Sequence, residues 1–238
     1  MPTLLDFHTH VAPAVDDGAE TLSESKRMLL RMKETGVECA VVTPHFYPEL
    51  QSLDAFLKAR ESAWETLTQI SPAERPELLL GAEVAYFSSI GRARSLSEVC
   101  IRGTRILLLE MPFYPWNEAV MNDIFELVHT QGFQVVLGHI ERYFKFGAKK
   151  YLQRLLNMGV FLQVNAETLL DAKARKTVLP LIRSGSIHLL GSDAHRAEGV
   201  RVPNLSEGFL ALREIAPEMA EQSAELGRRL LGLCSEKH

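Results

Sequence analysis

The sequence is poor in cysteine and has no long hydrophobic run. Its 238 residues contain three cysteines, Cys39, Cys100 and Cys234. An odd number of widely separated thiols argues against a disulfide framework and for a reducing compartment. No apolar run approaches the roughly 18 residues of a membrane-spanning helix, and the N-terminal segment lacks the basic and apolar regions of a signal peptide. We therefore predict a cytoplasmic protein without membrane insertion.

An excess of positive charge is also lacking. The chain has 26 lysines and arginines against 30 aspartates and glutamates, a formal net charge of −4. Such a chain has no general attraction to nucleic acid, so we expect no nucleic-acid partner. A phosphorylated substrate would need a local positive site. The oligomeric state cannot be read from the sequence.

Three familiar catalytic motifs are absent. A thiol phosphatase places five residues between its cysteine and its arginine, whereas Cys100 and Arg105 have four between them. The chain has no Gly-x-x-x-x-Gly-Lys loop for nucleotide phosphates and no Gly-x-Ser-x-Gly nucleophile elbow. These absences leave catalysis to metal ions and water.

The chain does contain a regular alternation of buried strands and helices, which is typical of parallel βα units. We predict one α/β barrel domain over residues 1–238, with the helices of 207–233 packed on it. The active site of such a barrel lies at the carboxyl ends of its strands. A helix over 166–184 is expected to be interrupted or bent near Pro180. Strands are expected at 4–11, 39–43, 78–83, 107–110, 133–138, 160–164 and 187–190.

Imidazoles and carboxylates recur where these strands end. His8 and His10 close the first strand, and side chains two apart on a strand share a face, so both can bind one metal ion. Either Asp16 or Asp17, in the turn that follows, can reach the same place. The other candidates at strand ends are His45, Glu83, Glu110, His139, Asp193 and His195.

A metal centre explains why so many titratable groups gather in one barrel mouth, because they would otherwise repel one another or remain unsatisfied. About nine ligands suffice for two or three ions, and a nitrogen and oxygen set without thiolate suits Mn, Fe, Zn or Co. Such ions generate hydroxide at neutral pH, so hydrolysis is the expected reaction. The remaining histidines, His129, His188 and His238, are expected to take no part.

Two arginines fit phosphate recognition, because a guanidinium group matches phosphoryl oxygens. Arg142 follows His139 by three residues and Arg201 follows His195 by six, with Arg196 as the alternative to Arg201. Aromatic residues in the predicted loops either pack those loops or line a site for an aromatic leaving group. They are Phe46, Tyr47, Phe113, Tyr114, Trp116 and Tyr143.

Seven short motifs follow one another along the chain. They are His8-Thr9-His10, Val15-Asp16-Asp17-Gly18, Thr43-Pro44-His45, Gly81-Ala82-Glu83, Leu109-Glu110, His139-Ile140-Glu141-Arg142-Tyr143 and Ser192-Asp193-Ala194-His195. In this order they resemble the polymerase and histidinol phosphatase (PHP) superfamily. Within it, the chain is most similar to the bacterial manganese-dependent protein-tyrosine phosphatases of capsule and exopolysaccharide synthesis, from residue 4 to about 205.

This resemblance implies a distorted (β/α)7 barrel with three divalent metal ions, manganese first and iron, cobalt or zinc as alternatives. It also implies that Arg142 and Arg201 bind phosphate. The ligands it implies are His8, His10, Glu83 and Asp193 for the first ion, Glu83, Glu110 and His139 for the second, and Asp17, His45 and His195 for the third.

The implied activity is hydrolysis of a phosphomonoester by metal-activated hydroxide, with a tyrosine-phosphorylated protein such as a tyrosine autokinase as the substrate. One alternative is a small-molecule phosphatase of the same superfamily that acts on histidinol phosphate or a nucleotide. A TatD-like metal-dependent nuclease also begins with His-x-His, but the acidic balance of the chain disfavours it. A metal-binding module without hydrolytic activity is the remaining alternative, against which the complete ligand set argues.

Overall fold

Nine short parallel strands form the centre of the structure, a computed structural model that describes residues 4–233. The strands pair in the orders β1-β2-β4 and β3-β5-β6-β7-β8-β9. Since β3 continues the path of β2 and β5 continues that of β4, nine strands occupy seven positions, which confirms the predicted distorted (β/α)7 barrel. The strands are β1 (Leu4–Thr9), β2 (Val37–Val42), β3 (His45–Phe46), β4 (Glu77–Leu80), β5 (Glu83–Ala85), β6 (Ile106–Glu110), β7 (Gln134–Leu137), β8 (Phe161–Asn165) and β9 (Leu189–Gly191).

The first and last strands meet beyond their carboxyl ends. Thr9 forms a parallel bridge with Ala194. The main-chain N–H of His10 donates to the carbonyl of Ala194 at 2.9 Å, and the N–H of Asp193 donates to the carbonyl of His8 at 2.8 Å. The barrel is thus closed at the end where the predicted ligands lie.

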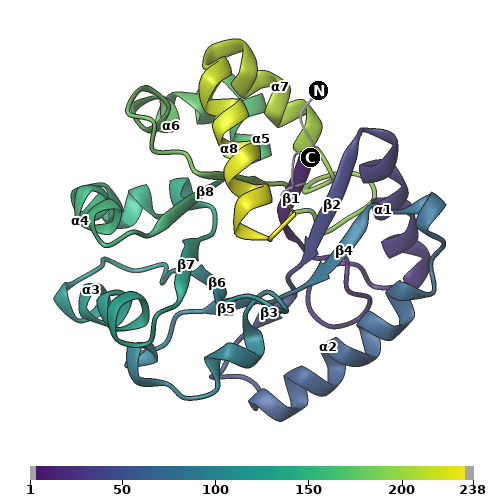
Figure 1. The fold of residues 1–238 in the computed structure, drawn as a ribbon, viewed down its shortest axis with the longest axis horizontal. Helices are drawn as coiled ribbons and strands as arrows, with labels where there is room; N and C mark the ends of the chain where they lie inside the picture. Colours follow the sequence, from purple (N-terminus) through teal and green to yellow (C-terminus); the bar gives the residue numbers. More distant parts are fainter. Residues whose placement is uncertain (1–3, 234–238) are drawn as a thin grey trace, which may run out of the picture.

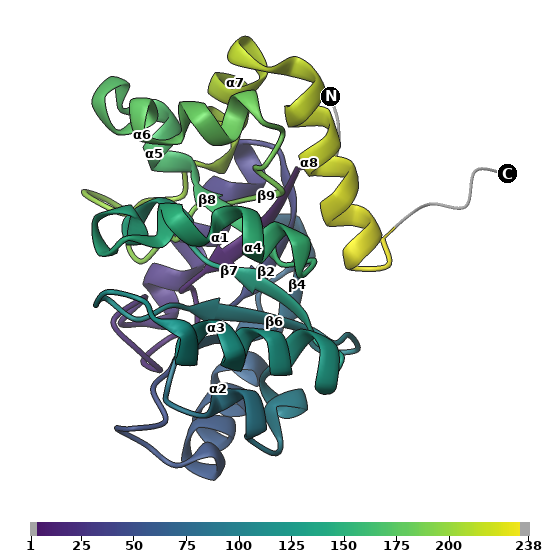
Figure 2. The same cartoon turned by 90° about the vertical axis from the view of Figure 1, so that its left-hand side faces the viewer.

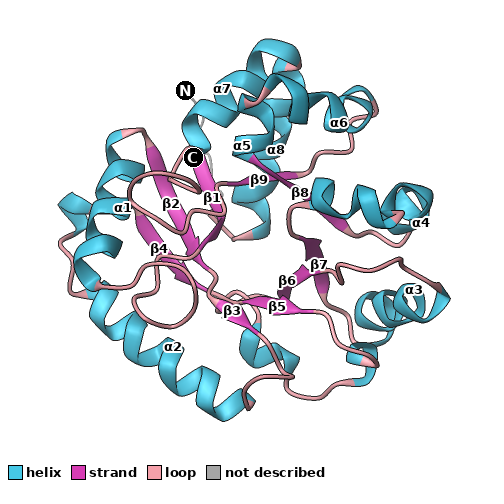
Figure 3. Ribbon diagram, turned by 180° about the vertical axis from the view of Figure 1, so that it is seen from behind, coloured by secondary structure: helices cyan, strands magenta, loops and turns pink. Residues whose placement is uncertain are grey.

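Helices surround the strands, as Figure 1 and Figure 3 show. The side chains of Thr21 and Ser52 cap the first two helices by accepting hydrogen bonds from main-chain N–H groups. Within residues 4–233, no helix has the length and apolar character that crossing a membrane requires. The α-helices are α1 (Leu22–Glu34), α2 (Leu53–Thr68), α3 (Glu118–Phe125), α4 (Leu152–Asn157), α5 (Ala166–Leu170), α6 (Ala172–Arg183), α7 (Leu205–Ile215) and α8 (Pro217–Leu230). Shorter helical turns are η1 (Pro72–Glu74), η2 (Ile90–Arg92), η3 (Leu96–Val99), the π-helical η4 (Glu126–Thr130), η5 (Ile140–Phe146) and η6 (Ala148–Tyr151).

Apolar side chains pack in two layers. Phe7 and Leu108 belong to a cluster inside the barrel, while Met28 and Phe56 belong to the larger layer between the strands and the helices. Helix α8 lies beside β9, as seen in Figure 2, and contacts β1 and β9. Its Gly227 allows this approach, because a Cβ there would lie 3.1 Å from the Phe7 ring. The amino end of the barrel is therefore covered by α8.

Several predicted boundaries were wrong. The strand expected at 78–83 is two strands interrupted at Gly81, and the last strand begins at Leu189 rather than at 187. The helix expected over 166–184 is interrupted at Asp171, whose side chain caps α6, while Pro180 lies inside α6. A capping carboxylate offers the backbone a new helix start, which accounts for the interruption at Asp171.

Candidate metal centre

A register shift in β1 directs both histidines of the first motif to the centre. Phe7 packs in the barrel interior, so strict alternation would point His8 outward. The pairing of β1 with β2 shifts between Asp6 and Thr9, and such an irregularity re-aims the side chains that follow it. His8 and His10 therefore both reach the centre, and both are fully buried.

Three of the predicted site residues have left-handed backbone conformations, with φ of +32° at His139, +52° at Asp193 and +54° at Arg201. Residues other than glycine rarely adopt this conformation, which costs on the order of 1–3 kcal/mol each and persists only where the surrounding structure imposes it. At His139 the conformation has a clear effect. Val136 faces the interior, so the alternation of β7 alone would direct His139 away from it.

Glu83 lies at the middle of the centre. Its Oε2 is 3.0 Å from His8 Nε2 and 3.3 Å from His10 Nε2. The same oxygen is 3.0 Å from His45 Nδ1, and Oε1 is 2.8 Å from His139 Nε2. One buried carboxylate thus contacts four imidazoles that come from β1, β3 and the end of β7.

The two aspartates of the turn after β1 have different positions. Asp17 is largely exposed, and its Oδ1 lies 3.6 Å from His45 Nε2 and 3.3 Å from His195 Nε2. Asp16 is nearly buried and accepts hydrogen bonds from His10 Nδ1 at 2.7 Å and from the N–H of His45 at 2.8 Å. Asp17 therefore faces the centre, while Asp16 orients the ring of His10.

Hydrogen bonds at the periphery determine how three histidine rings are protonated. His8 Nδ1 lies 3.2 Å from Gln163 Oε1, and His195 Nδ1 lies 2.9 Å from the carbonyl of Asp193. His10 Nδ1 faces the carboxylate of Asp16 in the same way. Since each partner is an oxygen acceptor, Nδ1 donates, so that Nε2 is the nitrogen that each ring presents to the centre and the one that a cation would bind in the neutral form.

A chain of amide hydrogen bonds on β8 connects ligands from both ends of the sequence. Gln163 Oε1 accepts from the N–H of His139 at 2.8 Å, and Gln163 Nε2 donates to Asn165 Oδ1 at 3.0 Å. Asn165 Nδ2 then donates to Asp193 Oδ2 at 2.9 Å. Sequence analysis missed both residues, although two amides two apart in a buried apolar strand were a usable signal, because buried polar groups need partners.

Burial and neighbouring charges shift the pKa values of the centre. Burial opposes the ionisation of Glu83, but the charges of His8 and His45 outweigh it and lower its pKa. Burial, reinforced by the charge of Glu83, raises the pKa of Glu110 to about 7. Burial lowers the pKa of His45 to about 4 and that of His195 to about 3. Burial opposes protonation of His8 and His10 as well, but the neighbouring carboxylates outweigh it and raise the pKa values of both rings, that of His10 more strongly. A divalent cation would displace these protons, because ionised carboxylates and neutral imidazoles are the forms that bind it.

The residues present fit a metal centre. Glu83 Oε2, His45 Nδ1 and His195 Nε2 are buried, and despite contacts of 3.0–3.3 Å with one another or with Asp17 none of them forms a hydrogen bond of suitable geometry among the described residues. Leaving such atoms unpaired costs about 1–3 kcal/mol each, a cost that a cation at this position removes. The nine predicted ligands all lie in four overlapping groups whose ligand atoms are within 4.8 Å of one another. These groups are His10, Asp17, His45 and His195; His8, His10 and Asp193; His8, Glu83 and His139; and His45, Glu83 and Glu110.

The structure distinguishes the three candidate arginines. Arg142 and Arg201 each donate to Asp193, at 2.6 and 2.7 Å, and remain about one third exposed. The side chain of Arg196 instead donates to the carbonyls of Gly18 and His195. Arg142 and Arg201 therefore lie at the edge of the centre, whereas Arg196, although equally exposed, is turned away from it to Gly18 and Glu20.

The predicted loop aromatics fall into two sets. Phe46, Trp116 and Tyr143 are buried and pack the structure. Phe113 and Tyr114 are about half exposed, while Tyr47 stacks on the ring of His45 with centroids 4.8 Å apart. Only this second set can contact a substrate.

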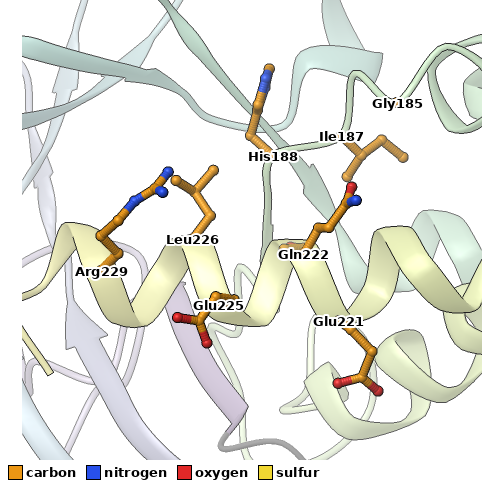
Figure 4. Close-up of a pocket in the computed structure, with 9 residues that line it drawn as sticks. Gly185, Ile187, His188, Glu221, Gln222, Glu225, Leu226 and Arg229 are labelled. Atoms are coloured by element: carbon orange, nitrogen blue, oxygen red, sulfur yellow. The ribbon is translucent and has the colours of Figure 1, made fainter. Parts of the chain in front are cut away.

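A cavity of about 450 Å³ lies at the opposite end of the barrel, between α8 and the residues that precede β9. Figure 4 shows Gln222, Leu226 and Arg229 on the side of α8 that faces His188 and Ile187. None of the predicted ligands lines this cavity.

His188 and His129 lie apart from the centre, as expected, and His238 and Cys234 lie outside the described residues.

A seven-position α/β barrel whose mouth holds buried imidazoles and carboxylates is the architecture of a PHP-type metal-binding protein. The family model for capsular polysaccharide synthesis, CpsB/CapC, matches residues 4–225. The chain therefore belongs to the CpsB/CapC family, and the resemblance predicted from the motifs is confirmed.

The alignments with named relatives span nearly the full length of both proteins. It is 26% identical to the tyrosine-protein phosphatase CpsB of Streptococcus agalactiae, over 92% of this chain and 94% of that protein. It is 22% identical to the tyrosine-protein phosphatase YwqE of Bacillus subtilis, over 94% and 91%. A crystal structure from a study of YwqE from B. subtilis and CpsB from Streptococcus pneumoniae, described there as unique metal-dependent tyrosine phosphatases, matches with a TM-score of 0.82 at 21% identity. It covers 98% of this chain and 96% of the other.

Proposed function

We propose that this protein is a metal-dependent protein-tyrosine phosphatase that acts in capsule or exopolysaccharide synthesis. The observation that carries the proposal is the convergence of four imidazoles on the buried Glu83 carboxylate, with partnerless ligand atoms beside it. The names of the CpsB and YwqE relatives support the reaction class.

The centre is proposed to hold three divalent ions, manganese first, with iron, cobalt or zinc as alternatives. When bound, such ions supply Lewis acidity to phosphoryl oxygens and a hydroxide nucleophile at neutral pH. The proposed ligands are His8, His10, Asp17, His45, Glu83, Glu110, His139, Asp193 and His195.

The residues around the centre have separate tasks in this reaction. Arg142 and Arg201 bind and orient the phosphoryl oxygens, because their guanidinium groups converge on Asp193 at the edge of the centre and both side chains are partly exposed. Gln163 and Asp16 hold the rings of His8 and His10 in place. The phenolate of tyrosine is a good leaving group, so the chain needs little help from a proton donor.

The proposal includes a single barrel domain, a cytoplasmic site of action and a tyrosine-phosphorylated protein, such as a tyrosine autokinase, as the partner.

Burial of Cys39 and Cys100 raises the pKa of their thiols, to about 12 and about 11. These two thiols are therefore protonated at neutral pH and do not serve as nucleophiles.

The test compares a phosphotyrosyl peptide with histidinol phosphate, with Mn²⁺ added to protein that has been stripped of metal. We expect cleavage of the peptide and an increase of the melting temperature on addition of Mn²⁺. His10→Ala is expected to lose both effects, while the matched variant His129→Ala retains them. Preferential cleavage of histidinol phosphate would favour the small-molecule alternative. Metal binding without cleavage of any phosphomonoester would favour a non-hydrolytic module.

A further inference from the structure

A segment beside the metal centre carries positive charge that the described part of the chain does not neutralise. Residues 142–151 contain four cations and no carboxylate, in a protein whose net charge is −4. Arg142 pairs with Asp193. Lys145, Lys149 and Lys150 are exposed, and none of them forms an ion pair with any residue in the range 4–233.

Aromatic rings lie next to all three lysines, and Lys150 Nζ is 4.7 Å from the centre of the Tyr151 ring. Lys145 Nζ is 5.0 Å from the centre of the Phe146 ring, and Lys149 Nζ is 5.1 Å from that of Phe144. Phe113, which is 47% exposed, packs against Phe146 with ring centroids 6.0 Å apart. An exposed contact of this kind contributes only about 0.5–1 kcal/mol, so each ammonium group remains able to bind a carboxylate. We call Phe113, Phe144, Lys145, Phe146 and Lys149 the lysine–aromatic surface.

This surface adjoins the centre through one buried side chain. The Phe113 ring lies 5.4 Å from that of Tyr143, centroid to centroid. The Tyr143 hydroxyl is 3.0 Å from His139 Nδ1. Because η5 and η6 follow β7, the surface stands at the barrel end that holds the predicted ligands. An extended peptide advances about 3.3 Å per residue, so a few residues beside a bound phosphotyrosine can span it.

We propose that the lysine–aromatic surface binds an acidic stretch next to the phosphotyrosine of the substrate protein, an inference that rests on the proposed function. Carboxylates of the substrate pair with Lys145 and Lys149, and its apolar groups cover Phe113 and Phe146. Nucleic acid and anionic membranes are less suitable partners, since the chain is acidic overall. In addition, Phe113 and Phe146 pack edge to face, with 73° between their planes, rather than standing free to stack or insert.

The experiment uses two phosphotyrosyl peptides of equal length, one flanked by glutamates and one by glutamines, with p-nitrophenyl phosphate as a third substrate. The wild-type protein is expected to have the lower KM for the glutamate peptide, and added salt reduces this advantage. In the double variant Lys145→Glu/Lys149→Glu, the ratio of kcat/KM between the glutamate and glutamine peptides falls by about 5–20-fold. The neutral variant Lys145→Gln/Lys149→Gln shows a smaller fall.

The matched control is Lys33→Glu/Arg183→Glu, with the same charge change in the last turns of α1 and α6, at the other end of the barrel. It is expected to leave the ratio unchanged. Equal ratios in the wild type and in Lys145→Glu/Lys149→Glu overturn the inference. A second outcome also overturns it. In that outcome the wild type binds phosphatidylserine vesicles or a thymidine oligonucleotide, Lys145→Glu/Lys149→Glu loses this binding, and the kcat/KM ratio between the two peptides is unchanged. If the wild type cleaves neither peptide nor p-nitrophenyl phosphate, the proposed function itself fails, and the inference with it.

Discussion

At the amino end of the barrel, α8 and the residues before β9 border an open cavity of about 450 Å³, whereas at the carboxyl end buried ring nitrogens and carboxylate oxygens lie about 3 Å apart. The cavity is lined by ordinary side chains of a helix and a loop, such as Gln222 and Leu226. The carboxyl end contains charged groups that are buried, close together and in part without partners. Comparing the two ends shows that buried polar atoms lying close together point to a functional site better than the volume of a cavity does. They favour the carboxyl end of the barrel.

The largest effect is expected from Glu83→Gln, because it removes the charge on which four imidazoles converge. Metal content should be largely lost, and phosphatase activity should fall on the order of 1,000-fold. Metal analysis and kinetics with a phosphotyrosyl peptide measure both quantities. The control is Glu77→Gln, at the exposed start of β4 near the amino end. Wild-type metal content in Glu83→Gln would refute the assignment of the centre.

The next effect concerns the amide chain on β8. Gln163→Leu removes the acceptor of His8 Nδ1 and of the His139 N–H. Because peripheral hydrogen bonds orient ligands, metal affinity is expected to fall about 10–100-fold. Titration calorimetry with Mn²⁺ measures the change directly. Gln134→Leu, the same substitution at the exposed start of β7, should leave affinity unchanged, and equal affinities in both variants would show that Gln163 only fills space.

A smaller effect is expected at the edge of the centre. Arg201→Lys keeps the charge but removes the forked donor group, so kcat/KM for a phosphotyrosyl peptide should fall about 10-fold. Arg196→Lys should change it less than about twofold, because Arg196 is turned to the carbonyl of Gly18. The reverse order of the two effects would assign the phosphate contact to Arg196.

The smallest effect is expected at the amino end. Arg229→Ala and Gln222→Ala alter the lining of the cavity and should change kcat and KM less than about twofold. A substantial loss of activity without a change of melting temperature would contradict the comparison, since it would link the cavity to catalysis.

The candidate site could be predicted where simple strand alternation holds. His45 and Glu83 continue the alternation of the interior residues Val41 and Leu79 that precede them, so their common direction follows from spacing. His8 reaches the centre only through the register shift in β1, and His139 only through its left-handed backbone. Spacing could not reveal these two features, although the motifs named both residues.

Other parts of the site depend on turns and on burial, which the sequence leaves open. The choice between Asp16 and Asp17 is decided by a tight turn in which a Cβ at Gly18 would lie 2.2 Å from the carbonyl oxygen of His10. The choice between Arg196 and Arg201 depends on a turn in which the N–H of His195 donates to the carbonyl of Arg201 at 2.7 Å. Such turns depend on contacts between distant segments, which local patterns do not contain.

The closure of the barrel between β1 and the segment after β9 has a consequence for how the protein matures. His8 and Asp193 stand at opposite ends of the polypeptide, and their backbones are joined by a hydrogen bond. During synthesis the early ligands leave the ribosome long before their last partners exist, and contacts of such high sequence separation form late. If the proposed ions bind, we therefore expect the full set to be acquired late in folding, once the chain has been completed past His195 and the early and late ligands have come together.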